Sequence, residues 1–217
     1  MITINDIYQS REIKVLLETT AIQMSSLGYT EHSFRHCRLV SEKCGEILAY
    51  IQADKRIVEV GKIAGYIHDI GNAVNRVHHA FTGSLLAYDI LVRKGMSYEE
   101  SAMVMIAIAN HDEGEGIPVN QIGAALILAD KADVHRSRVT NRMQETFDIH
   151  DRVNFAVTSS RLSLTDKQAI LDIEIDTTLC PVMDYFEIFL YRMKMCRKSA
   201  EFLDLTFVLK INGTQLL

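Results

Sequence analysis

Proline is scarce in this chain. Only two occur among 217 residues, at positions 118 and 181, and there is no internal repeat, low-complexity run or linker. Proline ends or kinks helices because it lacks the backbone N–H group, so its scarcity permits long helices in a compact fold. The length suits one domain with a small appendage and is sufficient to bury a sizeable core.

Cysteines, long apolar runs and positive charge are also limited. The four cysteines match no zinc or redox spacing, so we expect buried hydrophobic residues in a reducing compartment: Cys37, Cys44, Cys180 and Cys196. No apolar run reaches the roughly eighteen residues of a membrane span, and residues 1–9 carry no secretion signal, which favours a cytoplasmic protein. The net charge of −5 argues against nucleic-acid binding, so local positive charge must bind any anionic ligand.

Apolar residues recur at intervals of three and four through most of the first 140 residues, which is typical of helices with one buried face. Thr30 and the capping box at 97–100 mark two helix starts. The pattern predicts helices over residues 5–26, 30–51, 55–69, 78–93, 97–111 and 120–138. Residues 124–129 are apolar all round, so we expect the last of these helices to be buried.

From Val157 onward the apolar period changes to two, which indicates half-buried strands. Strands are expected over residues 171–175 and 207–211, and residues 161–163 pair with the first across a turn at 165–167. Pro181 opens a helix that continues to about residue 203. We therefore predict a mainly α chain with a helical bundle over about residues 5–142, and a small C-terminal α+β appendage of antiparallel strands and one helix. The expected domains are 1–150 and 151–217.

Residues 64–72 bring an adjacent imidazole and carboxylate, His68 and Asp69, to the end of an apolar helix. Both are good ligands for a divalent metal. Adjacent helical residues point about 100° apart, so one ion can contact both only where the backbone turns away. We expect Gly71 to supply that turn. A second His-Asp pair occurs at positions 111–112, so the dipeptide alone proves little.

Ligand-type side chains recur on or beside the apolar faces of five helices. They are His36, His68 with Asp69, His79, His111 and Asp130. Any single one of these histidines is more simply explained as a core residue bonded to a backbone carbonyl. Together they favour a metal site, because an unpaired buried polar group costs several kcal/mol. Asp130 is the most telling, since a carboxylate at the end of an apolar helix is rarely buried without a cation.

The order and spacing of these residues resemble the HD-domain metal-dependent phosphohydrolase superfamily, whose pattern is H…HD…H…H…D. The match spans about residues 30–140, and its motifs are His36-Cys37-Arg38-Leu39-Val40, His68-Asp69-Ile70-Gly71, His79 with Gly83, His111-Asp112-Glu113 and Ala129-Asp130-Lys131. The resemblance implies an all-α core in which the first metal is held by His36, His68, Asp69 and Asp130. It also implies that Asp69 bridges to a second ion held by His79 and His111, with His68 and Asp69 as catalytic residues.

The chain departs from two sequence forms found within that superfamily, the HDIGK form and the branch that cleaves cyclic di-GMP. Asn72 stands where the HDIGK form has a lysine, which removes one expected phosphate contact. Asp112 replaces a second histidine of the branch that cleaves cyclic di-GMP, and the tyrosine of the following GYP segment is missing, so that substrate is not expected. His32 occupies the position of a glutamate in that branch, one turn before His36. We retain His32 and Asp112 as additional candidate ligands, with a plain surface histidine as the alternative for His32.

The predicted ligand set suits two divalent ions of iron, manganese, nickel, cobalt or zinc. Such a pair can activate a bridging water and bind a phosphate oxygen, which is the two-metal route to phosphoester hydrolysis. We predict hydrolysis of a phosphomonoester or phosphodiester of a small molecule, with a nucleotide favoured. Three alternatives stay open: an HD-fold di-iron oxygenase, a catalytically silent nucleotide-binding regulator and, as the weakest in view of the acidic balance, a nucleic-acid binding module.

Substrate-binding residues are predicted from cations beside the expected ligands. Lys131, His135, Arg138 and Arg142 form one stripe if the last helix continues, and could receive phosphate oxygens. A solvated helix face is the alternative. Arg35 and Asn72 are further candidates. An exposed edge of the C-terminal sheet would favour pairing of two protomers as a homodimer.

Overall fold

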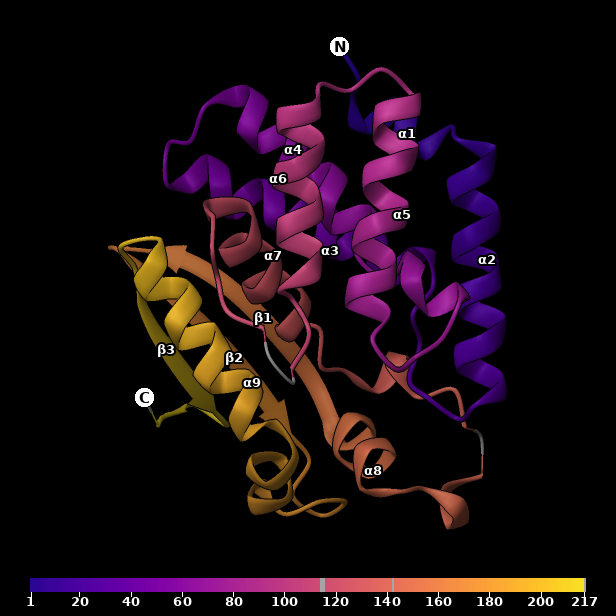
Figure 1. The fold of residues 1–217 in the computed structure, drawn as a ribbon. Helices are drawn as coiled ribbons and strands as arrows, with labels where there is room; N and C mark the ends of the chain where they lie inside the picture. Colours follow the sequence, from indigo (N-terminus) through magenta and orange to yellow (C-terminus); the bar gives the residue numbers. More distant parts are fainter. Residues whose placement is uncertain (114–115, 142, 217) are drawn as a thin grey trace.

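The computed structural model describes residues 1–113, 116–141 and 143–216 and places a helical body beside a C-terminal sheet (Figure 1). The helical body comprises α1 (Ile4–Tyr8), α2 (Arg11–Ser26), α3 (Phe34–Tyr50), α4 (Lys55–Ile67), the 3-10 helix η1 (Ile70–Ala73), α5 (His79–Arg93), α6 (Tyr98–Ala109) and α7 (Gln121–Lys131). The predicted helical bundle is therefore confirmed. All four cysteines are free and buried, as expected. Within the described part of the chain, no helix is long and apolar enough to span a membrane.

Three of the predicted helices differ from the structure by more than two residues. The helix expected to start at Thr30 begins at Phe34, because Ser33 and not Thr30 is its N-cap. The helix expected over residues 5–26 is divided into α1 and α2, because Thr3 and Asp6 form a capping box for α1 and the extended Ser10 begins α2. The helix expected over residues 120–138 ends at Lys131. Its apolar part is the buried centre of the molecule, where α7 packs against α3, α4, α6 and α9. Asp130 is thereby brought into the middle of the helical body.

The C-terminal part begins with short elements that the sequence pattern did not predict. It comprises η2 (Arg136–Arg138), η3 (Gln144–Thr146), α8 (Ile149–Ala156), β1 (Val157–Thr165), β2 (Gln168–Ile175), α9 (Val182–Phe202), β3 (Thr206–Ile211) and β4 (Thr214–Gln215). Because of this sheet, the all-α description applies to the helical body and not to the whole chain. The predicted boundary at residue 150 lies inside α8, and the division into two domains stays a prediction.

The sheet has the order β1-β2-β3-β4. Strands β1 and β2 pair antiparallel across a two-residue turn, as predicted, with positive φ at Asp166 (46°) and Lys167 (61°). Strands β2 and β3 are parallel, so the expectation of an entirely antiparallel appendage was wrong. The reason is that α9 forms the long crossover that parallel neighbours require. Helix α9 packs on β2, β3 and α7, so it joins the sheet to the helical body (Figure 1).

Element η1 lies directly against α5, and two glycines permit this contact. We expected Gly71 to supply the turn after the His-Asp pair, but it lies inside η1 and does not have a positive φ. Its role is steric, because a Cβ there would overlap the carbonyl oxygen of His79 and the backbone nitrogen of Gly83. A Cβ at Gly83 would meet Gly71 N at 3.1 Å, a tight but less severe contact. The small residues therefore set the distance between the His-Asp pair and His79.

We predict that Gly71→Ala destabilises the protein by about 3 kcal/mol or more, because overlap with backbone cannot be relieved by a side-chain rotation. Gly83→Ala is the matched control and should cost about 1 kcal/mol, since its contacts need only a small shift. Urea unfolding of both variants measures the difference. Equal losses would show that η1 and α5 are not held at this distance by the missing Cβ of Gly71.

Candidate metal centre

The His-Asp pair lies where helix α4 ends and the backbone changes direction. His68 is the C-cap residue with helical backbone angles, whereas Asp69 precedes η1 with φ −97° and ψ 2°. Two adjacent side chains can therefore reach the same point, and His68 Nε2 lies 3.2 Å from Asp69 Oδ2. Both side chains are buried. The predicted location at a helix end is confirmed.

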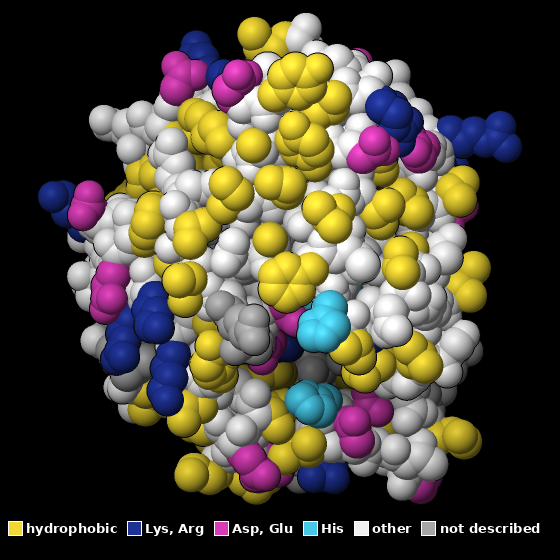
Figure 2. All heavy atoms as spheres, in the orientation of Figure 1, with side chains coloured by type: hydrophobic (Ala, Val, Ile, Leu, Met, Phe, Trp, Pro, Cys, Tyr) yellow, Lys and Arg dark blue, Asp and Glu magenta, His cyan; other side chains and the backbone are white. Residues whose placement is uncertain are grey.

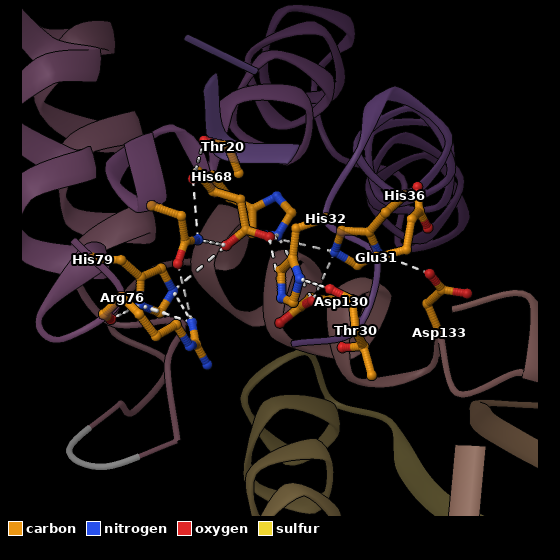
Figure 3. A network of polar contacts seen from close by, with 12 residues as sticks. Thr20, Thr30, Glu31, His32, His36, His68, Arg76, His79, Asp130 and Asp133 are labelled. Carbon is orange, nitrogen blue, oxygen red and sulfur yellow. Dashed lines mark hydrogen bonds and ion pairs between the residues drawn. The ribbon is translucent and has the colours of Figure 1, made fainter. Parts of the chain in front are cut away.

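One oxygen of Asp69 faces three imidazoles. Besides its contact with His68, Oδ2 lies 3.7 Å from His36 Nε2 and 4.0 Å from His32 Nε2. Asp130 Oδ1 faces the same place, 3.3 Å from His36 Nε2 and 3.7 Å from His68 Nε2. Figure 3 shows these histidines gathered around Asp130. The carboxylates of residues 69 and 130 thus share one group of ring nitrogens.

The other oxygen of Asp69 faces a second group. Oδ1 lies 3.5 Å from His79 Nε2 and 3.9 Å from His111 Nε2. The Asn72 amide donates to the same oxygen at 2.9 Å and to the Asp69 carbonyl at 3.1 Å, which holds the carboxylate in this orientation. A carboxylate whose two oxygens point at separate imidazole groups has the arrangement of a bridging ligand.

The five imidazoles are oriented by the same kind of contact, which is made by the Nδ1 atom of each ring. Each Nδ1 is within hydrogen-bonding distance of an oxygen acceptor: Thr30 O for His32 (2.6 Å), Asp133 Oδ2 for His36 (2.7 Å), Gly65 O for His68 (2.8 Å), Arg76 O for His79 (3.2 Å) and Ile108 O for His111 (2.6 Å). These Nδ1 contacts leave each Nε2 facing one or both of the two carboxylates. Metal-ligating histidines are oriented in this way by their second ring nitrogen.

Two of the Nε2 atoms lack a hydrogen-bond partner in the described part of the chain. His36 Nε2 and His68 Nε2 are buried and have no hydrogen-bond partner among the described residues. Such a group costs roughly 1–3 kcal/mol unless something satisfies it. The side chains form two groups whose ligand atoms lie within 4.8 Å of one another, His36–His68–Asp130 and His68–Asp69–His111. Each group could hold a metal ion, and the donor set fits a divalent transition metal.

The electrostatics of the site also favour a cation. Burial opposes ionisation of Asp69, but the surrounding His68, His32 and His111 hold its pKa well below the usual range. Burial likewise opposes protonation of His68, yet the two carboxylates outweigh it and raise its pKa to about 10. The site therefore attracts positive charge. Burial lowers the pKa of His32 to about 3 and of His79 to about 4, which keeps both in the neutral form that ligates metals.

Asp133 is a supporting residue that the sequence analysis missed. Its Oδ2 accepts from His36 Nδ1 at 2.7 Å and from Arg35 Nη2 at 3.1 Å, and its backbone carbonyl accepts from Arg138 Nη1 at 3.0 Å. Figure 3 shows Asp133 on the far side of His36 from the cluster. One feature of the sequence could have identified Asp133 as a candidate. It is a second carboxylate three residues after Asp130, a spacing that places two side chains on the same side of a helix.

The predicted cationic stripe does not form, because α7 ends at Lys131. A short turn follows, in which Asp133 N donates to Asp130 O, and the Asp133 side chain is bound by His36 and Arg35. These tertiary contacts replace the expected helix. Arg138 is buried and donates to Glu31 O, while His135 contacts Ser137 and Thr158. Arg142 lies outside the described residues.

Of the other predicted site residues, some line the pocket and some do not. Lys131 lines the pocket and donates to Asp130 Oδ2 at 2.7 Å. Arg35 pairs with Glu31 and Asp133 rather than facing the pocket, and Asn72 is buried against Asp69. Asp112 lines the pocket, 3.7 Å from His79 Nδ1, but belongs to neither candidate metal group.

A cavity of about 250 Å³ opens onto the candidate ligands. Asp69, His79, His111 and Asp130 line its inner part. Further lining residues come from α8 and α9 and were not predicted: His150, Asp151, Asn154, Phe189 and Arg192. Figure 2 shows a face of the molecule on which histidine and acidic side chains border a hollow. The appendage therefore forms part of the pocket wall.

Comparisons with known proteins give distant similarities. No protein-family model matches the chain. The uncharacterized protein MJ1020 of Methanocaldococcus jannaschii is 23% identical over 170 residues, which is 67% of this chain and 65% of that protein, just under two thirds of its length. Among solved structures, the crystal structure of a predicted HD superfamily hydrolase from an uncultured Thermotogales bacterium has 23% identity and a TM-score of 0.47. That alignment covers 62% of this chain and 75% of the other.

We predict that Asp69→Ala lowers the metal content of the purified protein more than loss of any other single carboxylate, because its two oxygens face two different sets of ring nitrogens. Asp112→Ala is the matched control and should retain metal close to the wild-type level. Elemental analysis after dialysis, with a thermal melt of each variant, measures both effects. Full metal stoichiometry in Asp69→Ala would place the site elsewhere.

We further predict that Asp133→Asn weakens metal affinity by roughly 10–100-fold while the protein stays folded, because a neutral amide orients the His36 ring less strongly. Arg35→Gln should have a smaller effect, since the contact between His36 and Asp133 survives. Competition with a coloured chelator measures both affinities. If the two variants bind metal equally, Asp133 does not act through His36.

Proposed function

We propose that this protein is a metal-dependent phosphohydrolase of the HD-domain type, acting on a phosphomonoester of a small molecule, with nucleotides as the favoured substrates. The observation that carries the proposal is the convergence of five oriented imidazoles on the two buried carboxylates of Asp69 and Asp130. The residues that would hold a first ion are His36, His68, Asp69 and Asp130. Those that would hold a second are Asp69, His79 and His111, with His32 beside the first group.

Divalent ions bound here would supply Lewis-acid polarisation of a phosphoryl oxygen and a water of lowered pKa, so no side-chain nucleophile is needed. The protein's own contribution is positional. Asn72 holds the orientation of Asp69, and the buried Nδ1 contacts hold the rings. Arg76 and Lys131 line the same cavity and can bind further phosphate oxygens.

The charge of the pocket supports a phosphomonoester. Its described lining residues include six carboxylates, Asp69, Asp112, Glu113, Asp130, Asp148 and Asp151, and four basic side chains, Arg76, Lys131, Arg138 and Arg192. With neutral histidines the lining carries a net charge of −2, which two divalent cations would change to +2. A phosphomonoester carries about −2 at neutral pH and balances this charge. A phosphodiester carries less negative charge and a triphosphate carries more.

We predict that the protein loaded with Mn²⁺ under strictly anaerobic conditions releases inorganic phosphate from nucleoside monophosphates. Triphosphates and bis-aryl phosphodiesters should be poorer substrates, because their charges do not match the pocket. Phosphate release in a substrate panel measures both claims, and a chelator should abolish it. Asp69→Ala is the inactive control.

Other outcomes of the same assay would identify the alternatives. Turnover that requires iron and molecular oxygen would contradict hydrolysis and indicate an HD-fold oxygenase. Nucleotide binding without turnover, across metals and substrates, would indicate a catalytically silent regulator. Faster cleavage of diesters than of monoesters would overturn the charge argument while leaving the hydrolase assignment intact.

A further inference from the structure

Helix α9 presents an arginine to the pocket in a fixed orientation. Phe189 and Arg192 are three residues apart on this helix and both line the cavity. The Arg192 guanidinium carbon lies 4.3 Å from the centroid of the Phe189 ring, and Phe189 is buried. Contact with a buried aromatic ring limits the positions open to the guanidinium, so it loses less freedom when it binds a ligand.

Glu113 is the partner of this arginine. Arg192 Nε donates to Glu113 Oε1, and the same oxygen lies 3.8 Å from Lys131 Nζ. One carboxylate oxygen is therefore shared by two pocket cations. Among the described residues, the two Nη groups of Arg192 have no hydrogen-bond partner, so most of the guanidinium's donors are available.

The exposure of these side chains indicates an exchangeable contact. The Glu113 side chain is 29% exposed and that of Arg192 is 20% exposed. A pair that is partly exposed to solvent is screened by water, so it is weaker than a fully buried pair. A phosphate group can bind a guanidinium through two parallel hydrogen bonds and carries more charge than a carboxylate. It should therefore compete successfully with Glu113 for Arg192.

We infer that Arg192 of the appendage is a substrate-binding residue that receives the phosphate, and that Glu113 occupies this position until the substrate displaces it. The inference rests on the proposed function in requiring a phosphorylated substrate. It assigns the C-terminal appendage a role in substrate recognition. Lys131, released from Glu113 in the same exchange, would bind the phosphate from the side of Asp130.

The two residues should have opposite effects on anion affinity, which a purely structural ion pair would not show. We expect Arg192→Gln to weaken binding of inorganic phosphate to the Mn²⁺-loaded protein roughly tenfold, the loss of a charged hydrogen-bond donor. Glu113→Gln should tighten it by about threefold to fivefold, because the competing carboxylate charge is removed. Arg197→Gln is the matched control on the same helix, where Arg197 pairs only with Glu201 at 4.0 Å among the described residues. It should bind phosphate like the wild type.

Isothermal titration calorimetry with inorganic phosphate measures these affinities without turnover, and a thermal melt shows that each variant is folded. Wild-type affinity in Arg192→Gln, or unchanged or weaker affinity in Glu113→Gln, would overturn the inference. So would a wild-type protein that binds no phosphate. If no substrate is hydrolysed but phosphate affinity follows the expected order, the phosphohydrolase proposal fails and the inference stands.

Discussion

The buried carboxylate of Asp69 is the group on which the arrangement of this molecule depends. Its two oxygens face different sets of imidazoles, and the Asn72 amide fixes which oxygen faces which set. A buried charge of this kind is tolerated only when it is surrounded by groups that stabilise it. The second layer of contacts, from backbone carbonyls and from Asp133, directs the ring nitrogens to satisfy that requirement.

The helical body holds these groups in place through close packing. Helix α7 is buried along its length and carries Asp130 to the centre, and the contact of η1 with α5 sets the position of His79. Both features depend on small or apolar residues whose side chains cannot bind a metal or transfer a proton. Metal ligands must be positioned within a fraction of an ångström, which a densely packed interior provides better than a mobile loop does.

The C-terminal appendage supplies part of the pocket wall. Helix α9 packs on α7 and on the sheet, and this packing brings Arg192 close to Glu113 and Lys131. Helix α8 adds carboxylate and amide groups to the same cavity. The pocket wall therefore combines candidate metal ligands of the helical body with polar side chains of the appendage.

The sequence by itself determined the helical body, the strand-rich C-terminus and most of the candidate ligands, because helical periodicity reveals which face is buried and ligand-type residues stand out on it. Only the tertiary structure decided the end of α7, the parallel pairing of β2 with β3, and the positions of Asp133 beside His36 and of Arg192 in the pocket. The end of α7 and the position of Asp133 depend on contacts with His36 and Arg35, almost one hundred positions earlier in the chain. Arg192 meets Glu113 across a separation of 79 residues, and no local pattern encodes a contact at that distance.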